Sequence, residues 1–310
     1  MQSLQPLGGS FATDGNGLRF IPRFPFQDGT SYSLLVGLAP ARSGSRGAEV
    51  WSLIRPATLI APTTDVVAIY PSAEELPVNQ LKLYIHFSNP MSEGWAVRGI
   101  RLRRADTGEL LRDVFLAQEP ELWDPQRRRL TLLLDPGRIK RGLAPHEEAG
   151  YPLVEGVPIV VKVDEAFRDA RGQPLRASME RRYRVGPVVR ARVDPSDWRY
   201  RFPAVGSKRP LIVEFDRSLD HALLEHSLWV TNTAGAPLEG RVSVGVGERC
   251  WRFEPDSPWG AGRYTLTVDP SLEDLAGNSV RRVFDRDLHR EEDTPIEVQQ
   301  LRLDFYCAGG

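Results

Sequence analysis

The stretch "WRFEPDSPWGAGRYTLTV", Trp251 to Val268, decides the fold, because its features recur near the start of the chain as "LRFIPRFPFQDGTSYSLLV", Leu18 to Val36. Both stretches have an alternating apolar strand, two prolines three positions apart, an aromatic residue, a glycine and a second strand that carries a tyrosine. Strict alternation is typical of a strand with one buried side and one solvent-facing side. We therefore interpret each stretch as a pair of strands within a repeated unit.

Short alternating runs dominate the remaining sequence. They include "LKLYIHF" from Leu81, "RRLTLLL" from Arg128, "PIVVKV" from Pro158, "PLIVEF" from Pro210 and "GRVSVGV" from Gly240. The 25 prolines and 27 glycines supply turns between these runs. Together they predict an all-β chain of antiparallel sheets. The best helix pattern is "SLDHALLEHSL", Ser218 to Leu228, which predicts two or three turns.

A second full copy of the unit lies in the middle of the chain. Its strand pair spans Arg128 to Val163, and each full copy ends in a similar turn, "DARGQPL" from Asp169 and "DLAGNSV" from Asp274. We expect both aspartates to accept hydrogen bonds from backbone N–H groups further along the turn. Gly172 and Gly277 are expected to take a positive φ, which reverses the chain before the final strand.

The first copy is incomplete. Only 17 residues precede Leu18, whereas about 40 to 50 residues of front half precede the equivalent point in the later copies. We expect Met1 to mark a truncation or an internal start. The fragment is then left with an open sheet edge, and we expect it to dock on the middle domain.

The pattern "F-x-P-x-x-P-W-x-x-G-x-Y-x-L-x-V" followed by "EDLAGN" resembles the bacterial Ig-like domains of the S-layer-protein type. The resemblance covers roughly residues 66–288 and implies tandem Ig-like antiparallel β-sandwiches, with a partial copy at the N-terminus. It implies a spacer or adhesive module of secreted and cell-surface proteins, and it brings no catalytic residues. The middle copy departs from the pattern through an insertion between its paired strands and through the ending "DARGQ".

These observations divide the chain into four parts. We predict a partial Ig-like repeat, its second half only, at 1–65, an Ig-like sandwich at 66–188 with an inserted loop at 137–156, an Ig-like sandwich at 189–288, and a C-terminal tail at 289–310. Alternation in the tail could add a strand to the last repeat or fill the edge left open by the partial copy.

Composition and charge exclude several classes of function. At 310 residues the chain is long enough for two domains, and its net charge of −1 argues against nucleic acid as a partner. There is no apolar run long enough to span a membrane and no signal-peptide pattern, so we expect any signal peptide to lie outside this chain. Cys250 and Cys307 lack the spacing of a zinc or redox motif, and a disulfide between them is open.

The histidines are the candidate metal ligands. Three histidines with an open position would suit Zn²⁺ and hydrolysis by a metal-bound water. His86 lies in one full copy and His221 and His226 in the next, which places them near the domain junction. Five residues of regular helix would turn His221 and His226 about 140° apart. Surface or hydrogen-bonded structural histidines are the alternative interpretation.

The inserted loop is the candidate ligand site. The segment "DPGRIKRGLAPHEE" from Asp135 carries Arg138 and Lys140 as donors for an anionic or sugar-like ligand, and Trp123 could supply a stacking face. Long loops on a rigid sandwich often bind ligands. A solvated turn of mixed charge is the alternative.

Taken together, the sequence predicts a non-catalytic extracytoplasmic Ig-like module that spaces domains or binds a protein or carbohydrate ligand, with no cofactor. The alternative is a metal-dependent hydrolase that uses Zn²⁺ at His86, His221 and His226. The chain has no GxSxG, Walker, dinucleotide or EF-hand motif to favour another chemistry.

Overall fold

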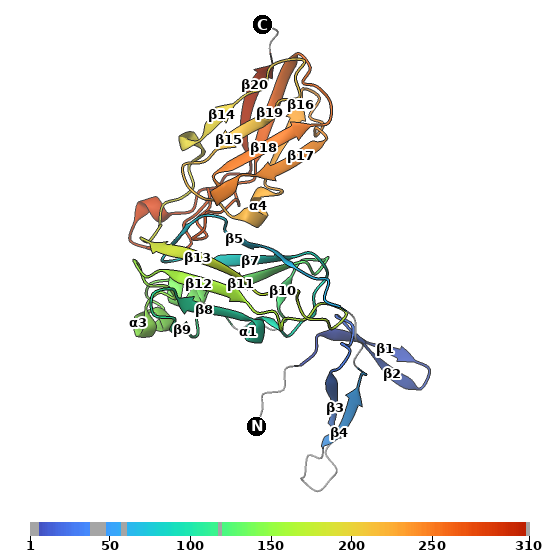
Figure 1. The fold of residues 1–310 in the computed structure, drawn as a ribbon. Coiled ribbons are helices and arrows are strands. Elements are labelled where there is room, and N and C mark those ends of the chain that lie inside the picture. Colours follow the sequence, from blue (N-terminus) through green and yellow to red (C-terminus); the bar gives the residue numbers. More distant parts are fainter. Residues whose placement is uncertain (1–5, 38–47, 57–60, 117–119, 308–310) are drawn as a thin grey trace.

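The computed structural model describes residues 6–37, 48–56, 61–116 and 120–307. The second of two β-sandwiches stands on one side of the first, and two hairpins project from one end of the first sandwich (Figure 1). The fold class is all-β, with Ig-like antiparallel sandwiches, as the alternating sequence predicts.

The first sandwich contains one four-stranded and one five-stranded sheet. The first sheet has, in spatial order, β10 (Leu122–Trp123), β11 (Arg129–Leu133), β7 (Lys82–Phe87) and β5 (Val66–Tyr70). The second has β6 (Glu75–Pro77), β13 (Met179–Gly186), β12 (Ile159–Val163), β8 (Ile100–Arg104) and β9 (Leu110–Leu111). Leu83, Ile85 and Phe87 alternate along β7 and are buried between the sheets.

Three short helices lie on the loops of this sandwich. They are α1 (Ala96–Gly99), α2 (Pro136–Ile139) and α3 (Ala144–Ala149). The inserted segment therefore contains two helical turns. Asp135 caps α2, because its side chain accepts a hydrogen bond from Gly137 N at 2.8 Å.

The second sandwich repeats this arrangement with fewer strands. One sheet has, in spatial order, β14 (Arg199–Arg201), β15 (Leu211–Glu214), β18 (Cys250–Pro255) and β17 (Gly240–Val244). The other has β16 (Leu228–Asn232), β19 (Gly262–Val268) and β20 (Leu301–Cys307). The order β14-β15-β18-β17 matches β5-β7-β11-β10, and β16-β19-β20 matches β8-β12-β13. The two sandwiches therefore share one topology.

The two closing turns have the geometry expected from the sequence. The Asp169 carboxylate accepts from Arg171 N and Gln173 N, and the Asp274 carboxylate accepts from Ala276 N and Asn278 N. Gly172 and Gly277 have φ values of 78° and 80°. This prediction is confirmed. It could be made from the sequence because the aspartate hydrogen bonds and the positive φ of the glycine all lie within five consecutive residues.

The helix predicted from Ser218 to Leu228 is wrong in length. It is reduced to α4 (His221–Leu224), whose N-cap is Asp220. The chain enters β16 at Leu228, which pairs with Val268 of β19. Pairing with β19 and burial of Leu228 outweigh the helical pattern of the second half of this segment.

The tail residues 301–307 form β20, which pairs antiparallel with the whole of β19. Phe305 and Cys307 point into the core of the second sandwich. Cys250 and Cys307 are both free thiols.

The N-terminal residues form two separate hairpins. The first consists of β1 (Gly9–Asp14) and β2 (Gly17–Pro22), and the second of β3 (Ser31–Gly37) and β4 (Ala48–Ile54). Between them, Phe24 is buried against the first sandwich, with its ring centroid 6.3 Å from that of Trp123. The segment between the hairpins therefore docks on the first sandwich, the predicted middle domain, whereas the hairpins themselves project from it.

Candidate functional site

The residues predicted to bind a ligand make separate structural contacts. Trp123 is only 8% exposed, so it cannot offer a stacking face to a ligand in this structure. Its indole N–H donates to Glu121 Oε2 at 2.9 Å, and its ring packs against Phe87 and Phe167. The physical reason is that β10 pairs with β11 and turns this side chain into the core.

The two cations of the inserted loop bind the protein itself. The Arg138 guanidinium donates to the backbone carbonyl oxygens of Gly150 and Tyr151 at 3.0 and 2.7 Å, which holds the ends of the loop together. Lys140 Nζ lies 4.5 Å from the ring centroid of Phe284, a residue that follows the second closing turn. Neither cation contacts Trp123, so the structure does not bring the three residues together.

Two of the three candidate histidines meet at the junction of the sandwiches. His86 on β7 and His221 at the start of α4 have ring centroids 5.8 Å apart. Tyr70 lies beside both, stacked on His221 at 3.4 Å and edge-on to His86 at 4.9 Å. The sequence indicated the junction but not the tyrosine between the rings.

His226 does not join this pair. It is exposed beyond the end of α4, and its backbone N–H bonds to the Leu223 carbonyl. In the described parts of the chain, no three side chains among His, Cys, Asp and Glu lie close enough to hold a metal ion. The predicted three-histidine ligand set is therefore not assembled in this structure, because α4 ends before His226.

The environment of His86 disfavours its charged form. Burial, together with nearby His221 and Arg129, lowers the pKa of His86 to about 4. Its Nε2 is buried and makes no hydrogen bond. His86 is therefore a neutral packing group at pH 7.

Glu248 anchors the second sandwich to the first. It ends the short turn η2 (Val246–Glu248) between β17 and β18, and its side chain is completely buried. Its carboxylate accepts hydrogen bonds from Ser72 N at 2.7 and 2.9 Å and from Ala73 N at 3.2 Å. In return, Gly247 N donates to Ser72 Oγ at 2.8 Å. His221 Nδ1 lies 3.3 Å from Glu248 Oε1.

A second polar cluster joins β7 to the start of α4. The Tyr84 hydroxyl donates to Asp220 at 2.7 Å, and Lys82 Nζ lies 2.6 Å from Glu273 and 3.4 Å from Asp220. Burial and the Asp220 charge raise the pKa of Tyr84 well above its ordinary value. Burial alone would lower the pKa of Lys82, but the two carboxylates outweigh it and raise that pKa. The lysine therefore stays charged and paired.

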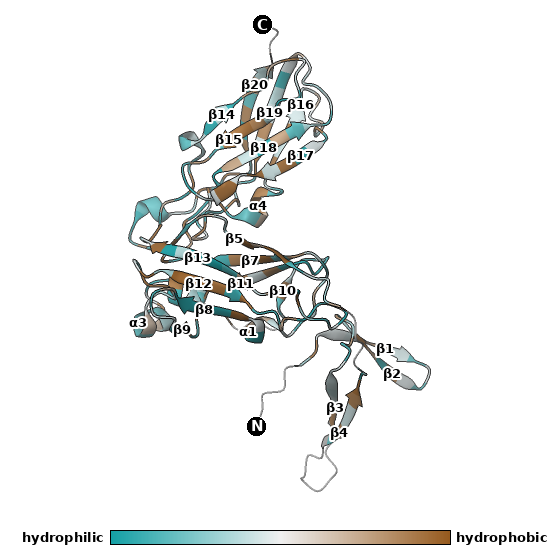
Figure 2. Ribbon diagram, in the orientation of Figure 1, coloured by the Kyte–Doolittle hydropathy of each residue, from teal (hydrophilic) through white to brown (hydrophobic). Residues whose placement is uncertain are grey.

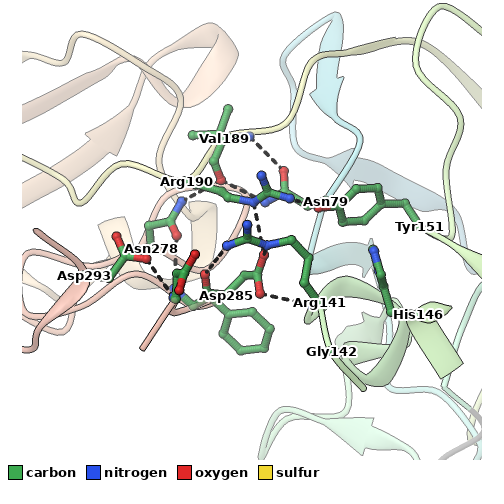
Figure 3. Close-up of polar contacts among 12 residues, drawn as sticks. Asn79, Arg141, Gly142, His146, Tyr151, Val189, Arg190, Asn278, Asp285 and Asp293 are labelled. Atoms are coloured by element: carbon green, nitrogen blue, oxygen red, sulfur yellow. Dashed lines mark hydrogen bonds and ion pairs between the residues drawn. The ribbon is translucent and has the colours of Figure 1, made fainter. Parts of the chain in front are cut away.

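A third cluster holds the linker between the sandwiches, the segment between β13 and β14 that contains Val189 and Arg190 (Figure 3). Asp285 accepts from the guanidinium Nε of Arg141 at 2.7 Å and of Arg190 at 3.0 Å. Asn79 exchanges two hydrogen bonds with the backbone of Val189, at 2.8 and 3.0 Å, and Asn278 donates to the same carbonyl at 3.1 Å. Residues of both sandwiches thus fix the linker on its two sides.

The junction holds the two sandwiches together through buried, paired polar groups. Most of its carboxylates and cations are paired with each other or with backbone groups. The cavity beside Tyr84, His221 and Asp274 has a volume of only about 10 Å³, which is room for about one water molecule. The sequence signals for Glu248 and Asp285 were weak, because each looks like an ordinary acidic residue in a turn.

Comparisons with known proteins find similar solved structures but no family to which the chain belongs. No family model matches the chain, and no curated protein matches it. A solved fragment of α2-macroglobulin from Escherichia coli covers 78% of this chain and 71% of its own length at 8% identity, with a TM-score of 0.27. The S-layer protein rSbsC(31-844) covers 80% of this chain at 8% identity with a TM-score of 0.28, and this chain spans 41% of it.

The tandem Ig repeats of Dlar cover 69% of this chain and 94% of their own length, at 10% identity and a TM-score of 0.23. At such scores, the fold assignment depends on the sheet topology of this chain itself.

No helix among the described residues is long and apolar enough to cross a membrane.

The low pKa of His86 gives the junction an expected response to pH. The His86 imidazole takes up its proton near pH 6.5 in the unfolded state but only near pH 4 in the folded state. The folded state therefore loses stability as pH falls through this window. The shift corresponds to at most about 3 kcal/mol, and we expect about 1–2 kcal/mol because the side chain is partly exposed. Between pH 7 and 4.5, the free energy of unfolding should therefore fall by about 1–2 kcal/mol less in His86→Gln than in the wild type.

Urea unfolding followed by tryptophan fluorescence at several pH values checks this. Burial raises the pKa of Asp274 to about 6, so its effect has the opposite sign, with stability lost as pH rises from about 4 to 6. Both proteins carry Asp274, so its effect cancels in the difference. Parallel curves for the wild type and His86→Gln would contradict the expectation.

Proposed function

We propose that this chain is a non-catalytic, extracytoplasmic Ig-like module that spaces other domains and presents surfaces to a protein or carbohydrate ligand. The observation that carries the proposal is the junction: three buried polar clusters, centred on Glu248, Asp220 and Asp285, cross between the sandwiches. A spacer must keep its length, and the buried hydrogen bonds of these clusters would be broken if the sandwiches bent apart, so they oppose the relative motion that two domains otherwise show.

The same clusters favour a structural role over catalysis. Each buried carboxylate accepts hydrogen bonds from donors that are fixed by the fold, namely Ser72 N, Tyr84 and Arg141. A catalytic carboxylate needs access to substrate, and Glu248 is 0% exposed. The extracytoplasmic location is supported by the sequence resemblance at "EDLAGN" alone.

A distance measurement between the sandwiches tests the spacer role. Spin labels at Val97→Cys on α1 and Tyr306→Cys on β20 replace exposed side chains, in a background with Cys250→Ala and Cys307→Ala. Double electron–electron resonance should give one narrow distance distribution. A broad or two-peaked distribution in a folded sample would exclude a rigid spacer.

A further inference from the structure

The first N-terminal hairpin has the same close backbone contact as a hairpin of the second sandwich, which is the last sandwich of the chain. A Cβ atom added to Gly9 would lie 2.5 Å from the Phe20 ring, and one added to Gly240 would lie 2.7 Å from the Phe253 ring. Gly9 pairs with Pro22 in the β1–β2 ladder, as Gly240 pairs with Pro255 in the β17–β18 ladder. The β1–β2 hairpin is therefore built like the β17–β18 hairpin.

A tyrosine contact extends this likeness to the second hairpin. The Tyr32 ring lies edge-on to Phe26 at 4.7 Å, and its hydroxyl accepts from Gln27 N at 2.6 Å. The Tyr264 ring lies edge-on to Trp259 at 5.1 Å, and its hydroxyl accepts from Gly260 N at 3.0 Å. In both cases the donor is the residue after the aromatic ring. Strands β1 to β4 therefore correspond to β17 to β20.

The corresponding strands differ in what covers them. In the last sandwich, β18 pairs with β15 on its other edge, and β19 pairs with β16. Among the described residues, β2 pairs only with β1 and β3 only with β4. Unpaired edges of this kind are templates for another strand.

The apolar side chains show the same difference. Trp251, Leu266 and Phe305 are 0%, 0% and 3% exposed in the last sandwich. At the corresponding positions, Leu18, Leu34 and Leu53 are 71%, 49% and 59% exposed. Figure 2 shows apolar residues along β4, which projects away from the first sandwich. Exposed apolar faces with open strand edges mark interaction surfaces.

We propose that the open face of β1 to β4 binds a front half of an Ig-like sandwich, a segment that is not among these 310 residues. That segment would add one antiparallel strand to the edge of β2 and one to the edge of β3. The occupant is indicated by the chain itself, because β11 pairs with β7 in the first sandwich as β18 pairs with β15 in the last. A second copy would offer only the back-half strands of its own hairpins, because its two front halves are already paired with β11 and β12 and with β18 and β19. The proposal goes beyond the spacer role, and either can fail without the other.

The last sandwich supplies the probe. A synthetic polypeptide of residues 194–239 contains β14, β15 and β16, the strands that cover β18 and β19. Added to the full chain, it should slow amide hydrogen exchange at least tenfold in Gly17–Pro22 and Ser31–Gly37, without slowing it further in β18 or β19. A scrambled polypeptide of the same composition should protect neither segment.

Two variants locate the binding. Leu34→Lys places a charge on the open face and should weaken binding of the probe at least tenfold. Leu288→Lys changes a side chain that is 78% exposed outside this face, and it should leave binding unchanged. Absence of protection at millimolar probe, equal protection by the scrambled polypeptide, or equal binding to both variants would overturn the proposal. So would a chain that is dimeric by light scattering and already protected in both segments without the probe.

Discussion

Replacement of Glu248 by alanine is expected to weaken the junction by about 3 kcal/mol, roughly a hundredfold in the equilibrium between docked and separated sandwiches. The carboxylate is 0% exposed and accepts from the backbone N–H groups of Ser72 and Ala73. Without it, two donors lose their acceptor at the junction, and each such loss costs about 1–3 kcal/mol. The alanine also leaves a cavity beside His221.

Calorimetry and the spin-label distance distribution measure this effect. The wild type should unfold with its two sandwiches coupled, whereas Glu248→Ala should show two transitions and a broader distance distribution. Glu254→Ala is the matched control, because Glu254 pairs with Arg241 on the exposed face of the same sandwich. If Glu254→Ala broadens the distribution as much as Glu248→Ala does, the anchoring role of Glu248 is wrong.

Trp251→Ala is expected to destabilise the last sandwich by about 4 kcal/mol, because a buried tryptophan leaves a large cavity. Its ring is 0% exposed and lies parallel to that of Phe253 at 6.1 Å. The corresponding change in the partial copy, Leu18→Ala, should cost less than about 0.5 kcal/mol, since Leu18 is 71% exposed.

Urea unfolding of both variants, followed by circular dichroism, makes this comparison. It measures how far the partial copy differs from a closed sandwich. A cost for Leu18→Ala above about 2 kcal/mol in the isolated chain would show that the face of β2 is already covered, and it would contradict the open face described above.

The sequence predicted features whose causes lie within a few residues. Alternation along β7 predicted its buried side, and the aspartate and glycine of each closing turn predicted its hydrogen bonds and its positive φ. The likeness of Leu18–Val36 to Trp251–Val268 also indicated two equivalent strands in each stretch, which share the tyrosine contact, but in both stretches the two strands lie in different sheets and do not pair with each other. Such features depend on backbone geometry and local hydrogen bonds, so they are readable before the chain is folded.

The candidate site depended on contacts that no local pattern encodes. Ser72 and Glu248 are 176 residues apart, and Tyr84 and Asp220 are 136 apart. The repeat indicated that His86 and His221 lie at the junction, but α4 ends at Leu224, and His226 beyond it is exposed and does not join them. Trp123 resembled a binding residue until pairing of β10 with β11 turned it inward.

By itself, the sequence determined the all-β class and the closing turns, because side-chain alternation and turn chemistry act between near neighbours. Only the tertiary structure decided which polar groups join the two sandwiches and which apolar face of the partial copy stays open. Those outcomes depend on desolvation and strand pairing between distant segments, and these are set when the whole chain has packed.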